Sequence, residues 1–533
     1  MKKIKSFLII SIMLGASAVA MSSCKDAPGP MDDPQPTVNF TMVENGNFEN
    51  GLAGWQVAGD ESAAILATDG CDGEGALKLT GTATVSRSLS GIPDGIYSLI
   101  FYYKNEGGQP DCYIEANGRK TSPAVSSSSW AKGFVHGVKV EGGKCEIRIV
   151  STTDDGKFCE WDGLRLSLTD KDYFLIKGGD ISELNYVEAN GGKYYQNGKV
   201  GDCLEILKAN GMNLVRLRLY NDPGKYTYDG VALPEGVQDE ADILALARRA
   251  KAAGMQILLT FHYSDTWTNG GVQFIPHAWE GQTAEQMAVS LHDFTYAFME
   301  KMKAQGTSPE YVSLGNETQA GMLYPLGGPL GGPLDGNYPD YRTSCQNIAL
   351  FYNAGYNAVK ESNPESRVII HLAGAGDESN YTWYFGLMKS YNVSYDIIGS
   401  SYYPYWTKNT AKQACDFAQT VTEQFDKDLI FMETGYAWSK TIDDGITDGQ
   451  LNHNGPYKDM SKLGQKNFML ELINEIKKVP NLRVLGFVYW DPIFIPAGSA
   501  GWALGQKNIV SNSALFDFSG NALEVLDAFK NNN

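Results

Sequence analysis

The sequence predicts an α/β protein in which a small all-β sandwich domain precedes a (β/α)8 TIM barrel. From residue 171 onwards, short apolar segments such as "NLVRLRLY" alternate with segments of helical periodicity such as "DEADILALARRAKAAG". This repeated strand–helix order is typical of a barrel of parallel strands surrounded by helices. Residues 38–170 contain short β-prone runs separated by Gly, Asp and Ser clusters, without a long helical period, and this pattern predicts a sandwich.

Residues 1–24 form a predicted lipoprotein signal peptide. Lys2, Lys3 and Lys5 precede the apolar stretch "FLIISIMLGASAVA", which is too short for a membrane-spanning helix. The stretch leads into "AMSSC", which resembles the lipobox of bacterial lipoproteins, in which a cysteine, here Cys24, is lipidated. We expect an exported protein that is lipid-anchored to a bacterial membrane, the outer membrane, and that contacts the membrane through this anchor alone. Ordinary secretory cleavage is the alternative.

Two further segments precede the barrel. Residues 25–37, "KDAPGPMDDPQPT", are rich in proline and aspartate and predict a stiff, solvated tether. Residues 38–170 open with "NGNFENGLAGW" and close with "CEWDGLRLSL", which resemble the galactose-binding-like sandwiches found beside many glycanases. Trp55, Trp130 and Trp161 are candidate sugar platforms in this carbohydrate-binding-like domain. Core tryptophans in a spacer domain are the alternative interpretation.

Charge and cysteine content restrict the possible partners. The formal net charge of −18 argues against nucleic acid or other polyanions. An acidic polysaccharide would need a basic cleft, so a neutral glycan fits this chain better. The chain has 8 cysteines including Cys24, and no pair of them has metal-ligand spacing. We expect the protein to act as a monomer.

Residues 171–533 contain the eight candidate strands of the barrel. They are "YFLIKGGD", "NLVRLRLY", "MQILLTFHY", "EYVSLGNE", "RVIIHLAG", "YDIIGSSYY", "LIFMETGY" and "RVLGFVYW". A doubly wound open sheet is the alternative fold, but such a sheet usually opens with a Gly-rich phosphate loop after its first strand. Here "IKGGDIS" lacks the G-x-G-x-x-G spacing, and the chain contains no G-x-x-x-x-G-K-[ST] motif.

Polar or aromatic residues follow all eight predicted strands, at the end where barrel active sites lie. In chain order they are Asp180, Arg216 and Arg218, His262, Asn316 and Glu317, His371, Tyr402, Glu433, and Trp490 with Asp491. A single residue of this kind is more often a loop or capping residue. The joint pattern at all eight ends indicates an active site at this rim.

Glu317 and Glu433 are the two carboxylates of the rim that point to glycoside hydrolysis. That reaction needs an acid that protonates the leaving oxygen and a carboxylate that attacks the sugar or activates water. The glutamates follow the fourth and seventh strands, which face each other across an eight-stranded barrel. A separation of about 5 Å permits retention and a wider one permits inversion, so the residues alone leave the stereochemistry open.

The same strand ends carry a family resemblance. Segments including "GMNLVRLRL", "DILALARRAKAAGMQILLTFHYSDTWTNGG", "SPEYVSLGNETQAGMLYPLGG", "YDIIGSSYYPYW" and "METGYAW" closely resemble glycoside hydrolase family 53, the arabinogalactan endo-β-1,4-galactanases. The resemblance covers residues 175–440 and implies retaining, double-displacement cleavage of internal β-1,4 bonds in galactan or arabinogalactan I. The alternatives are another retaining glycanase, with exo action or a different specificity, and a non-catalytic surface glycan-binding lipoprotein.

The resemblance and the physical roles together suggest what each residue near the two glutamates does. Glu317 is expected to be the acid/base and Glu433 the nucleophile, and catalysis is expected to need no cofactor. We expect Arg218 to keep Glu433 ionised through a charge-assisted hydrogen bond, and Tyr402 to orient it. Asn316 is expected to bind the sugar 2-OH, a contact that strengthens in the transition state.

Further residues of the rim and its loops are expected to bind the sugar. The candidates for hydrogen bonds to hydroxyl groups are Asp180, His262, Asp265 and His371. Galactose has an apolar C–H patch on one ring face that stacks on aromatic side chains. The candidate aromatic residues are Trp267, Trp279, Tyr403, Trp406, Trp438 and Trp490, the last as the platform at the cleaved bond. The Gly- and Pro-rich loop "YPLGGPLGGPLDGNYPDY" after the fourth strand is expected to border the cleft.

The loop after the seventh strand, "TIDDGITDGQLNHNGP", is the candidate metal site. Many bacterial members of the family hold calcium there through an Asp-Gly-His-x-Asn run, which here reads "DGQLN", with Gln in place of His. Oxygen ligands suit Ca²⁺, and the backbone carbonyl of Gln450 can serve whatever its side chain is. The resemblance therefore implies a structural calcium ion held by Asp448, Gln450 and Asn452. A solvated acidic loop is the alternative.

Overall fold

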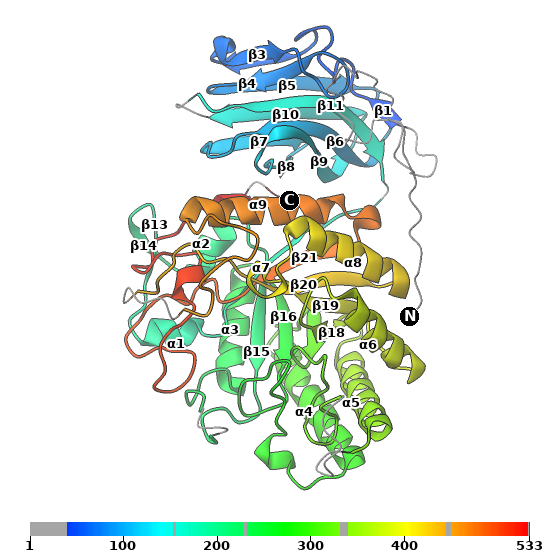
Figure 1. Ribbon diagram of the computed structural model, residues 1–533, viewed down its shortest axis with the longest axis vertical. Coiled ribbons are helices and arrows are strands. Elements are labelled where there is room, and N and C mark those ends of the chain that lie inside the picture. The colour runs from blue at the N-terminus through cyan, green and yellow to red at the C-terminus, as the bar shows by residue number, and fades with distance from the viewer. Residues whose placement is uncertain are drawn as a thin grey trace, which may run out of the picture.

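Figure 1 shows the computed structural model of the chain, in which the all-β unit lies on one side of a barrel wrapped by helices. The structure describes residues 40–152, 156–169, 171–227, 232–330, 339–443, 449–530 and 532. The predicted signal peptide, its Cys24 and the tether lie outside these residues. Within the described ranges, no helix has both the length and the apolar character that a bilayer crossing requires.

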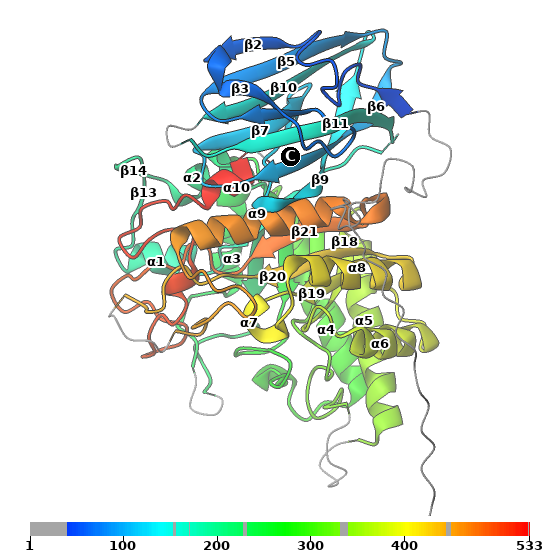
Figure 2. The same cartoon turned by 45° about the horizontal axis from the view of Figure 1, so that its top comes forward.

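The N-terminal unit consists of two antiparallel sheets packed face to face (Figure 2). The six-stranded sheet contains, in spatial order, β3 (Ala64–Ala67), β4 (Ala76–Leu79), β11 (Cys159–Leu168), β6 (Gly95–Asn105) and β9 (Ser126–Val140), with β1 (Phe40–Met42) beside β11. The five-stranded sheet contains β2 (Gln56–Gly59), β5 (Ala83–Ser90), β10 (Lys144–Thr152), β7 (Asp111–Ala116) and β8 (Arg119–Thr121). The predicted all-β fold of this unit is confirmed.

Inward-pointing side chains of the two sheets form the core of the sandwich. Burial alternates along β5 with the period of two that a strand imposes. Trp55 and Trp161 belong to this core, with exposed fractions of 7% and 0%, so these two candidate sugar platforms are wrong. Trp130 is partly exposed, and the Lys104 ammonium lies 4.7 Å from the centre of its ring.

The second unit is a closed barrel of eight parallel strands, which confirms the predicted fold class. In order these strands are β12 (Ile176–Asp180), β15 (Leu214–Leu219), β16 (Gln256–Phe261), β17 (Tyr311–Leu314), β18 (Arg367–Leu372), β19 (Ile397–Ser401), β20 (Asp428–Thr434) and β21 (Val484–Tyr489). Each strand pairs with the next one in this order, and β21 pairs with β12 to close the barrel. All eight carboxyl ends therefore meet at one rim.

Helices cover the outside of the barrel. The longer ones are α3 (Glu240–Ala252), α4 (Ala284–Ala304), α5 (Tyr341–Ser362), α6 (Glu378–Ser390), α8 (Ala411–Phe425) and α9 (Lys462–Lys478). The shorter elements are α1 (Leu184–Ala189), α2 (Cys203–Ala209), α7 (Pro404–Thr407), α10 (Leu526–Lys530), the hairpin β13 (Tyr194–Gln196) and β14 (Lys199–Gly201), and the 3₁₀ turns Glu61–Ala63, His277–Trp279, Pro480–Leu482 and Ser511–Ser513. Capping boxes led by Thr283 and Thr410 begin α4 and α8 and satisfy their first backbone N–H groups.

Inside the barrel, an apolar layer supports a polar layer at the rim. The apolar layer consists of Ile176, Leu214, Leu258, Ile369, Ile397, Ile430, Met432 and Val488. Side chains two residues further along a strand point the same way, so Arg216 follows Leu214 and His371 follows Ile369 inside the barrel. The strands thus place charged and polar groups directly above an apolar floor.

Helix α9 forms the seam with the sandwich, which lies on its outer side (Figure 1). Asn474 of α9 donates a side-chain hydrogen bond of 2.9 Å to the backbone carbonyl of Ser122. The His136 ring of β9 bonds the carbonyl of Lys477 at 2.8 Å. Asn532, at the end of the chain, accepts from the Ser122 backbone N–H at 3.3 Å. The C-terminal segment therefore joins the sandwich to the barrel.

Candidate active site

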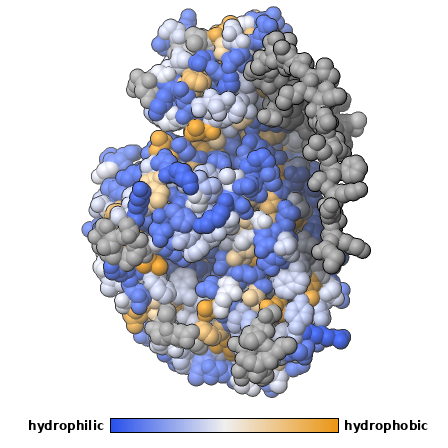
Figure 3. Space-filling view, in the orientation of Figure 1, coloured by the Kyte–Doolittle hydropathy of each residue, from blue (hydrophilic) through white to orange (hydrophobic). Residues whose placement is uncertain are grey.

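A cavity of about 650 Å³ opens at the carboxyl ends of the barrel strands. The predicted site residues that line it are Arg218, His262, Trp267, Asn316, Glu317, Tyr403, Trp406, Glu433, Gln450 and Trp490. Lining residues that no sequence argument had assigned to the site include Thr268, Gly270, Ser401, Thr407 and Trp502. The surface offers no competing apolar site on the face seen in Figure 3, where hydrophobic residues are scattered among hydrophilic ones and form no large patch. The concave cavity is therefore the candidate ligand site.

Glu433 is held by two donors at the end of β20. The Arg216 guanidinium donates to its Oε1 at 2.7 Å, and the Tyr403 hydroxyl donates to its Oε2 at 3.1 Å. Burial alone would lower the pKa of Arg216, but the charges of Glu433 and Asp180 outweigh it and keep the pKa above its usual value. Glu433 thus faces a permanent positive charge, and both of its oxygens are held in place.

Two predicted roles beside Glu433 are wrong. Arg216, not Arg218, bonds Glu433, because Arg218 lies two residues further along β15 and meets other carboxylates at that height. Tyr403, not Tyr402, orients Glu433. The Tyr402 side chain points to the outside of the barrel, where its hydroxyl donates to the carbonyl of Asn409 at 3.1 Å.

Glu317 has the opposite electrostatic environment from Glu433. Burial, followed by the charge of Glu433, raises the pKa of Glu317 to about 7, although the Ser401 hydroxyl, Arg216 and the Gly270 backbone N–H oppose the rise. The Ser401 hydroxyl donates to Glu317 Oε1 at 2.7 Å. The backbone of Glu317 is left-handed, with φ of 50°, which is rare for a residue with a side chain and is found at functional sites. A carboxyl group in this setting holds a proton near neutral pH.

Asn316, the chain neighbour of Glu317, is hydrogen-bonded to the same arginine that binds Glu433. The second arm of the Arg216 guanidinium donates to Asn316 Oδ1 at 2.7 Å, while Asn316 Nδ2 donates to the carbonyl of Thr268 at 2.9 Å. A side-chain amide carries two N–H groups, so one remains for a ligand in the cavity that Asn316 lines. The predicted contact with the 2-OH of a sugar stays a prediction.

The two rim histidines have different surroundings. His262 lines the cavity, its Nδ1 bonds Thr268 Oγ1 at 2.7 Å, and its buried Nε2 has no hydrogen-bond partner. Burial and the charges of Arg216 and Arg218 lower its pKa, so the ring is neutral. His371 is fully buried beneath the cavity and bonds Ser401 instead, so its predicted direct contact with a sugar is wrong.

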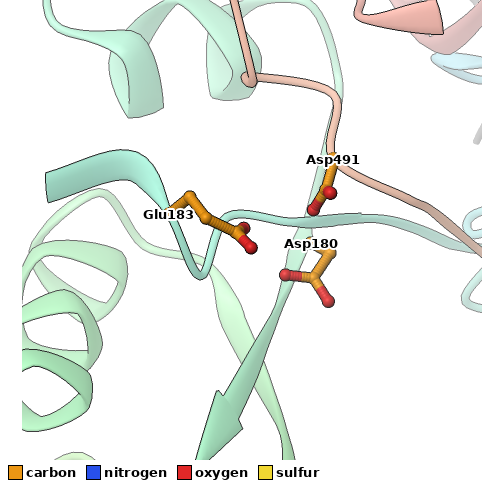
Figure 4. Close-up of side chains that lie close together, drawn as sticks. All are labelled: Asp180, Glu183 and Asp491. Atoms are coloured by element: carbon orange, nitrogen blue, oxygen red, sulfur yellow. The ribbon is translucent and has the colours of Figure 1, made fainter. Parts of the chain in front are cut away.

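Arg218 lies among three buried carboxylates, which Figure 4 shows converging from neighbouring segments. Its guanidinium contacts Asp491 at 3.0 Å, Asp180 at 3.2 Å, and Glu183. The oxygen atoms of these residues lie close enough together to hold a metal ion, but the guanidinium already supplies the positive charge they need. Burial raises the pKa of Glu183 and of Asp491, which opposes ionisation of both carboxyl groups. The predicted binding of sugar by Asp180 is wrong, because Asp180 is fully buried beneath the cavity.

Four tryptophans line the cavity: Trp267, Trp406, Trp490 and Trp502. Trp406 is the most open of them, with 57% of its surface exposed. The Arg218 guanidinium lies 4.8 Å from the centre of the Trp267 ring, and the indole N–H of Trp267 donates to the carbonyl of Trp502 at 2.9 Å. These rings give the cavity aromatic walls, which suit the apolar C–H face of a sugar ring.

Three other binding candidates have structural roles. The carboxylate oxygens of Asp265 accept the backbone N–H groups of Asp222, in the loop after β15, and of His277, and its exposed fraction is 1%. Trp279 packs against Tyr263 and Phe294, and Trp438 packs against Phe518, so neither ring lines the cavity. The predicted contacts of Asp265, Trp279 and Trp438 with sugar are therefore wrong.

The predicted calcium loop is described only in part. Asp448 lies outside the described residues, and so does the stretch 331–338 of the loop that follows β17. Gln450 lines the cavity and its buried Oε1 has no hydrogen-bond partner, whereas Asn452 is exposed. Calcium binding stays a prediction.

Ser401 and Trp502 are the main lining residues that sequence reasoning missed. Ser401 lies two residues after Gly399 on β19, so the period of two could have placed it inside the barrel. Trp502 lies in the long segment after β21 and meets Trp267 from a distant part of the sequence. Periodicity gives no signal for a contact between two loops.

Comparisons with known proteins agree with this geometry. Residues 176–529 match the sequence model of "Glycosyl hydrolase family 53", and the sandwich lies outside the match. The endo-beta-1,4-galactanase of Bacillus subtilis (strain 168) is 28% identical over 388 residues, which are 67% of this chain and 85% of the relative. The arabinogalactan endo-beta-1,4-galactanase of Cellvibrio japonicus (strain Ueda107) is 30% identical over 364 residues, which are 66% of this chain and 90% of the relative. A solved structure described as the Ignisphaera aggregans GH53 catalytic domain is 33% identical with a TM-score of 0.61, and covers 67% of this chain and 96% of its own.

Proposed function

Because the chain belongs to glycosyl hydrolase family 53 and is a glycoside hydrolase, we propose that it cleaves internal β-1,4 bonds of galactan with retention. The observation that carries the mechanism is the contrast between Glu317 and Glu433 within one cavity. Glu433 is bound to a buried arginine, whereas burial and the charge of Glu433 favour a proton on Glu317. One carboxylate is thus prepared to attack and the other to donate a proton.

In the first step, a carboxylate oxygen of Glu433 attacks the anomeric carbon while Glu317 gives its proton to the departing glycosidic oxygen. Arg216 and Tyr403 hold the two oxygens of Glu433, which limits the positions this carboxylate can take. The product of the step is a glycosyl ester on Glu433 and a free sugar hydroxyl on the leaving chain. No cofactor takes part in this proposed mechanism.

In the second step, Glu317 removes a proton from water, and the hydroxide oxygen displaces Glu433 from the anomeric carbon. Formation of the ester has removed the negative charge of Glu433, which was one cause of the raised pKa of Glu317. The carboxyl therefore becomes a stronger acid after the first step and stays ionised until it serves as a base. One residue can thus perform both roles.

The choice of galactan as substrate rests on three observations. The relatives in Bacillus subtilis and Cellvibrio japonicus carry the names of β-1,4-galactanases. Tryptophans on the cavity walls suit the apolar face of a galactose ring. The chain also has a net charge of −18, which favours a neutral polysaccharide over a polyuronate.

Incubation with linear β-1,4-galactan tests the activity, with chromatography for product size and proton NMR for the configuration of the first product. We expect a ladder of oligosaccharides that appear first as the β-anomer. Glu433→Gln and Glu317→Gln should each lose at least about a thousandfold in kcat on galactan. The matched control is Glu280→Gln, on the exposed surface. A single fixed product length would indicate exo action, an α-product would indicate inversion, and full activity in both variants would refute the mechanism.

We also propose that a structural calcium ion binds the loop that follows β20. The support is the buried Oε1 of Gln450, an oxygen ligand of the kind Ca²⁺ prefers, beside the acidic stretch that contains Asp448. Protein freed of metal by a chelator should gain thermal stability when Ca²⁺ is added, and Gln450→Ala should reduce the gain. An unchanged melting temperature would refute this assignment.

Export and lipid anchoring through Cys24 complete the proposal, and the N-terminal sequence supports them. Cells that express the full chain should incorporate a labelled fatty acid into the protein and retain it in the membrane fraction. Cys24→Ser should lose both properties. Release of unlabelled native protein into the soluble exported fraction would support ordinary secretory cleavage instead.

A further inference from the structure

A buried chain of hydrogen bonds lies behind the proposed acid/base. His371 Nε2 and Ser401 Oγ are 2.8 Å apart, and Ser401 Oγ is 2.7 Å from Glu317 Oε1. His371 is fully buried and Ser401 is 3% exposed, so bulk water does not compete for these bonds. The three groups come from β18, β19 and the turn after β17, and hence from adjacent strands of one barrel.

His371 determines which group donates and which accepts in this series of hydrogen bonds. Burial, together with the charge of Arg216, lowers the pKa of His371 well below its usual value, so the ring is neutral and has one N–H. The other ring nitrogen, Nδ1, is buried and has no hydrogen-bond partner. Proteins leave a buried acceptor without a partner more readily than a buried N–H. We therefore assign the proton to Nε2, from which it is donated to Ser401 Oγ.

This assignment leaves Ser401 one possible role toward Glu317. A hydroxyl has one proton, and its oxygen already accepts the N–H of His371. Its own proton is therefore donated to Glu317 Oε1. If Glu317 were protonated on Oε1, two protons would lie between the same two oxygens. The proton of the neutral carboxyl must lie on the other oxygen, Oε2.

We propose that Ser401 and His371 are positioning residues for the acid/base, and that they confine its transferable proton to Glu317 Oε2. The proposal rests on the proposed function, in which Glu317 protonates the leaving oxygen. It adds which atom gives the proton and which groups decide this. In the second step the same bond stabilises the ionised carboxylate that serves as the base.

Other groups also face Glu317 and change its pKa in addition to Ser401. The carboxylate of Glu433 disfavours ionisation of Glu317, and the Arg216 guanidinium and the Gly270 backbone N–H favour it. Burial raises the pKa of the Tyr381 and Tyr403 hydroxyls, and the charge of Glu317, which lies near both, raises it further. Removal of the Ser401 hydroxyl leaves all of these groups in place and deletes one donor to the ionised form.

The pH profile of kcat/KM on galactan tests this role. Loss of the donor raises the pKa of Glu317 further, so Ser401→Ala should move the alkaline limb to higher pH by roughly one unit. Its kcat at the optimum should fall about tenfold, because the carboxyl is less well oriented toward the leaving oxygen and the attacking water, while KM changes little. Ser401→Thr keeps a hydroxyl at the same position and should restore the native limb.

Ser400→Ala is the matched control. Ser400 is the neighbour of Ser401 on β19, is equally buried, and accepts a hydrogen bond from Tyr381 at 2.7 Å on the outer side of the strand. This variant removes a buried hydroxyl without contact with Glu317, so its alkaline limb should stay at the native pH. If both alanine variants shift equally, the effect comes from general loosening of the strand, and the proposal is wrong.

Nitrogen NMR of the histidine rings tests the donor–acceptor order of these hydrogen bonds without an activity assay. Substitution His371→Gln assigns the signal, and the native ring should show a protonated Nε2 and an unprotonated Nδ1 throughout neutral pH. His371→Leu should shift the alkaline limb in the same direction as Ser401→Ala, whereas the amide of His371→Gln can replace the donor. A ring protonated on Nδ1, or an unmoved limb in Ser401→Ala, would overturn the proposal.

Failure of this inference can be told apart from failure of the proposed function. If Glu317→Gln is inactive and the Ser401→Ala limb does not move, Glu317 remains the acid and the positioning role is refuted. If Glu317→Gln keeps its activity on galactan, the proposed function itself fails, and the histidine tautomer no longer bears on catalysis.

Discussion

The molecule buries one pair of cationic side chains at the barrel rim and another at the seam with the sandwich, and the two pairs have different surroundings. At the rim, Arg216 and Arg218 lie among carboxylates. The carboxylates are those of Asp180, Glu183, Glu433 and Asp491. Burial alone would lower the pKa of both arginines, but these neighbours outweigh it and keep both guanidinium groups charged.

At the seam with the sandwich, Lys177 and Lys477 donate to uncharged oxygens. Lys177 Nζ donates to the backbone carbonyl of Phe529 at 2.9 Å and to that of Asn532. Lys477 Nζ donates to Asn532 Oδ1 at 3.2 Å and to the hydroxyl of Thr121. Burial lowers the pKa of Lys177 to about 7 and that of Lys477 well below its usual value.

The difference shows which of the two regions depends on charge. At the rim, the proposed chemistry of Glu433 and Glu317 needs a fixed electrostatic field, and the carboxylates around the arginines maintain it. At the seam, a lowered lysine pKa has no consequence for the hydrogen bonds, since a neutral amine still donates. Strand β12 takes part in both regions, with Lys177 near its start and Asp180 at its end. Substitutions in the two regions should therefore affect different measurements.

Loss of Arg216 should have the largest effect on activity. Arg216→Met removes the partner of Glu433 Oε1 and of Asn316 Oδ1, so we expect kcat on galactan to fall about a thousandfold. Arg216→Lys should recover only part of this loss, because an ammonium cannot reproduce the two-armed contact. Steady-state kinetics measure both variants. Arg249→Met, which breaks surface ion pairs with Glu188 and Asp202, is the control. Near-native kcat in Arg216→Met would contradict a charge-dependent rim.

Loss of Arg218 should affect stability more than the chemical step. Arg218→Met leaves three buried carboxylates without their cation, which should lower the free energy of unfolding by about 3 kcal/mol at neutral pH. Denaturant titration measures the loss. Adding Glu183→Gln and Asp491→Asn to Arg218→Met should recover much of it, since Asp180 is then the one carboxyl left in the cluster and Arg216 lies 3.6 Å from it. If the triple variant is less stable than Arg218→Met, packing and not charge is the purpose of the cluster.

The parts of this architecture that are periodic could be predicted from the sequence. Apolar strands with polar ends identified the barrel, its rim, and Glu317 and Glu433 as a pair across it. The period of two predicts which face of a strand a residue occupies. It does not predict height above the barrel floor, so the contact with Glu433 that was expected of Arg218 belongs to Arg216.

Sequence periodicity could not predict the contacts between distant segments or the exact end of a strand. Tyr402 and Tyr403 differ by one position, and the end of β19 had to be placed to within one residue to know which one faces Glu433. Asp265 is a strand-end carboxylate in sequence, yet its two oxygens accept backbone N–H groups of Asp222, in the loop after β15, and of His277, in its own loop. The polar residue types indicated the position of the rim correctly. They could not show which polar side chains are free to bind a ligand and which are already bonded to loop backbone.

The smallest expected effect concerns the seam and appears only as pH dependence. In the unfolded chain Lys177 has the ordinary lysine pKa of about 10.4, whereas burial lowers its pKa to about 7 in the folded protein. Between these values the unfolded state binds more protons, so the contribution of Lys177 to the free energy of unfolding rises with pH. This contribution should increase by about 2 kcal/mol from pH 7 to pH 9, and it should change little below pH 7.

Lys177→Met should remove this slope, and the difference between native and variant stabilities, measured by denaturant titration at several pH values, isolates it from other groups. Lys199→Met, at an exposed position of β14, is the control and should leave the slope unchanged. Activity on galactan at a fixed pH should stay native in Lys177→Met, because the lysine lies at the opposite end of β12 from the rim. A parallel pH dependence in native protein and Lys177→Met would mean that this lysine remains charged, and that the rim and the seam hold buried charge in the same way.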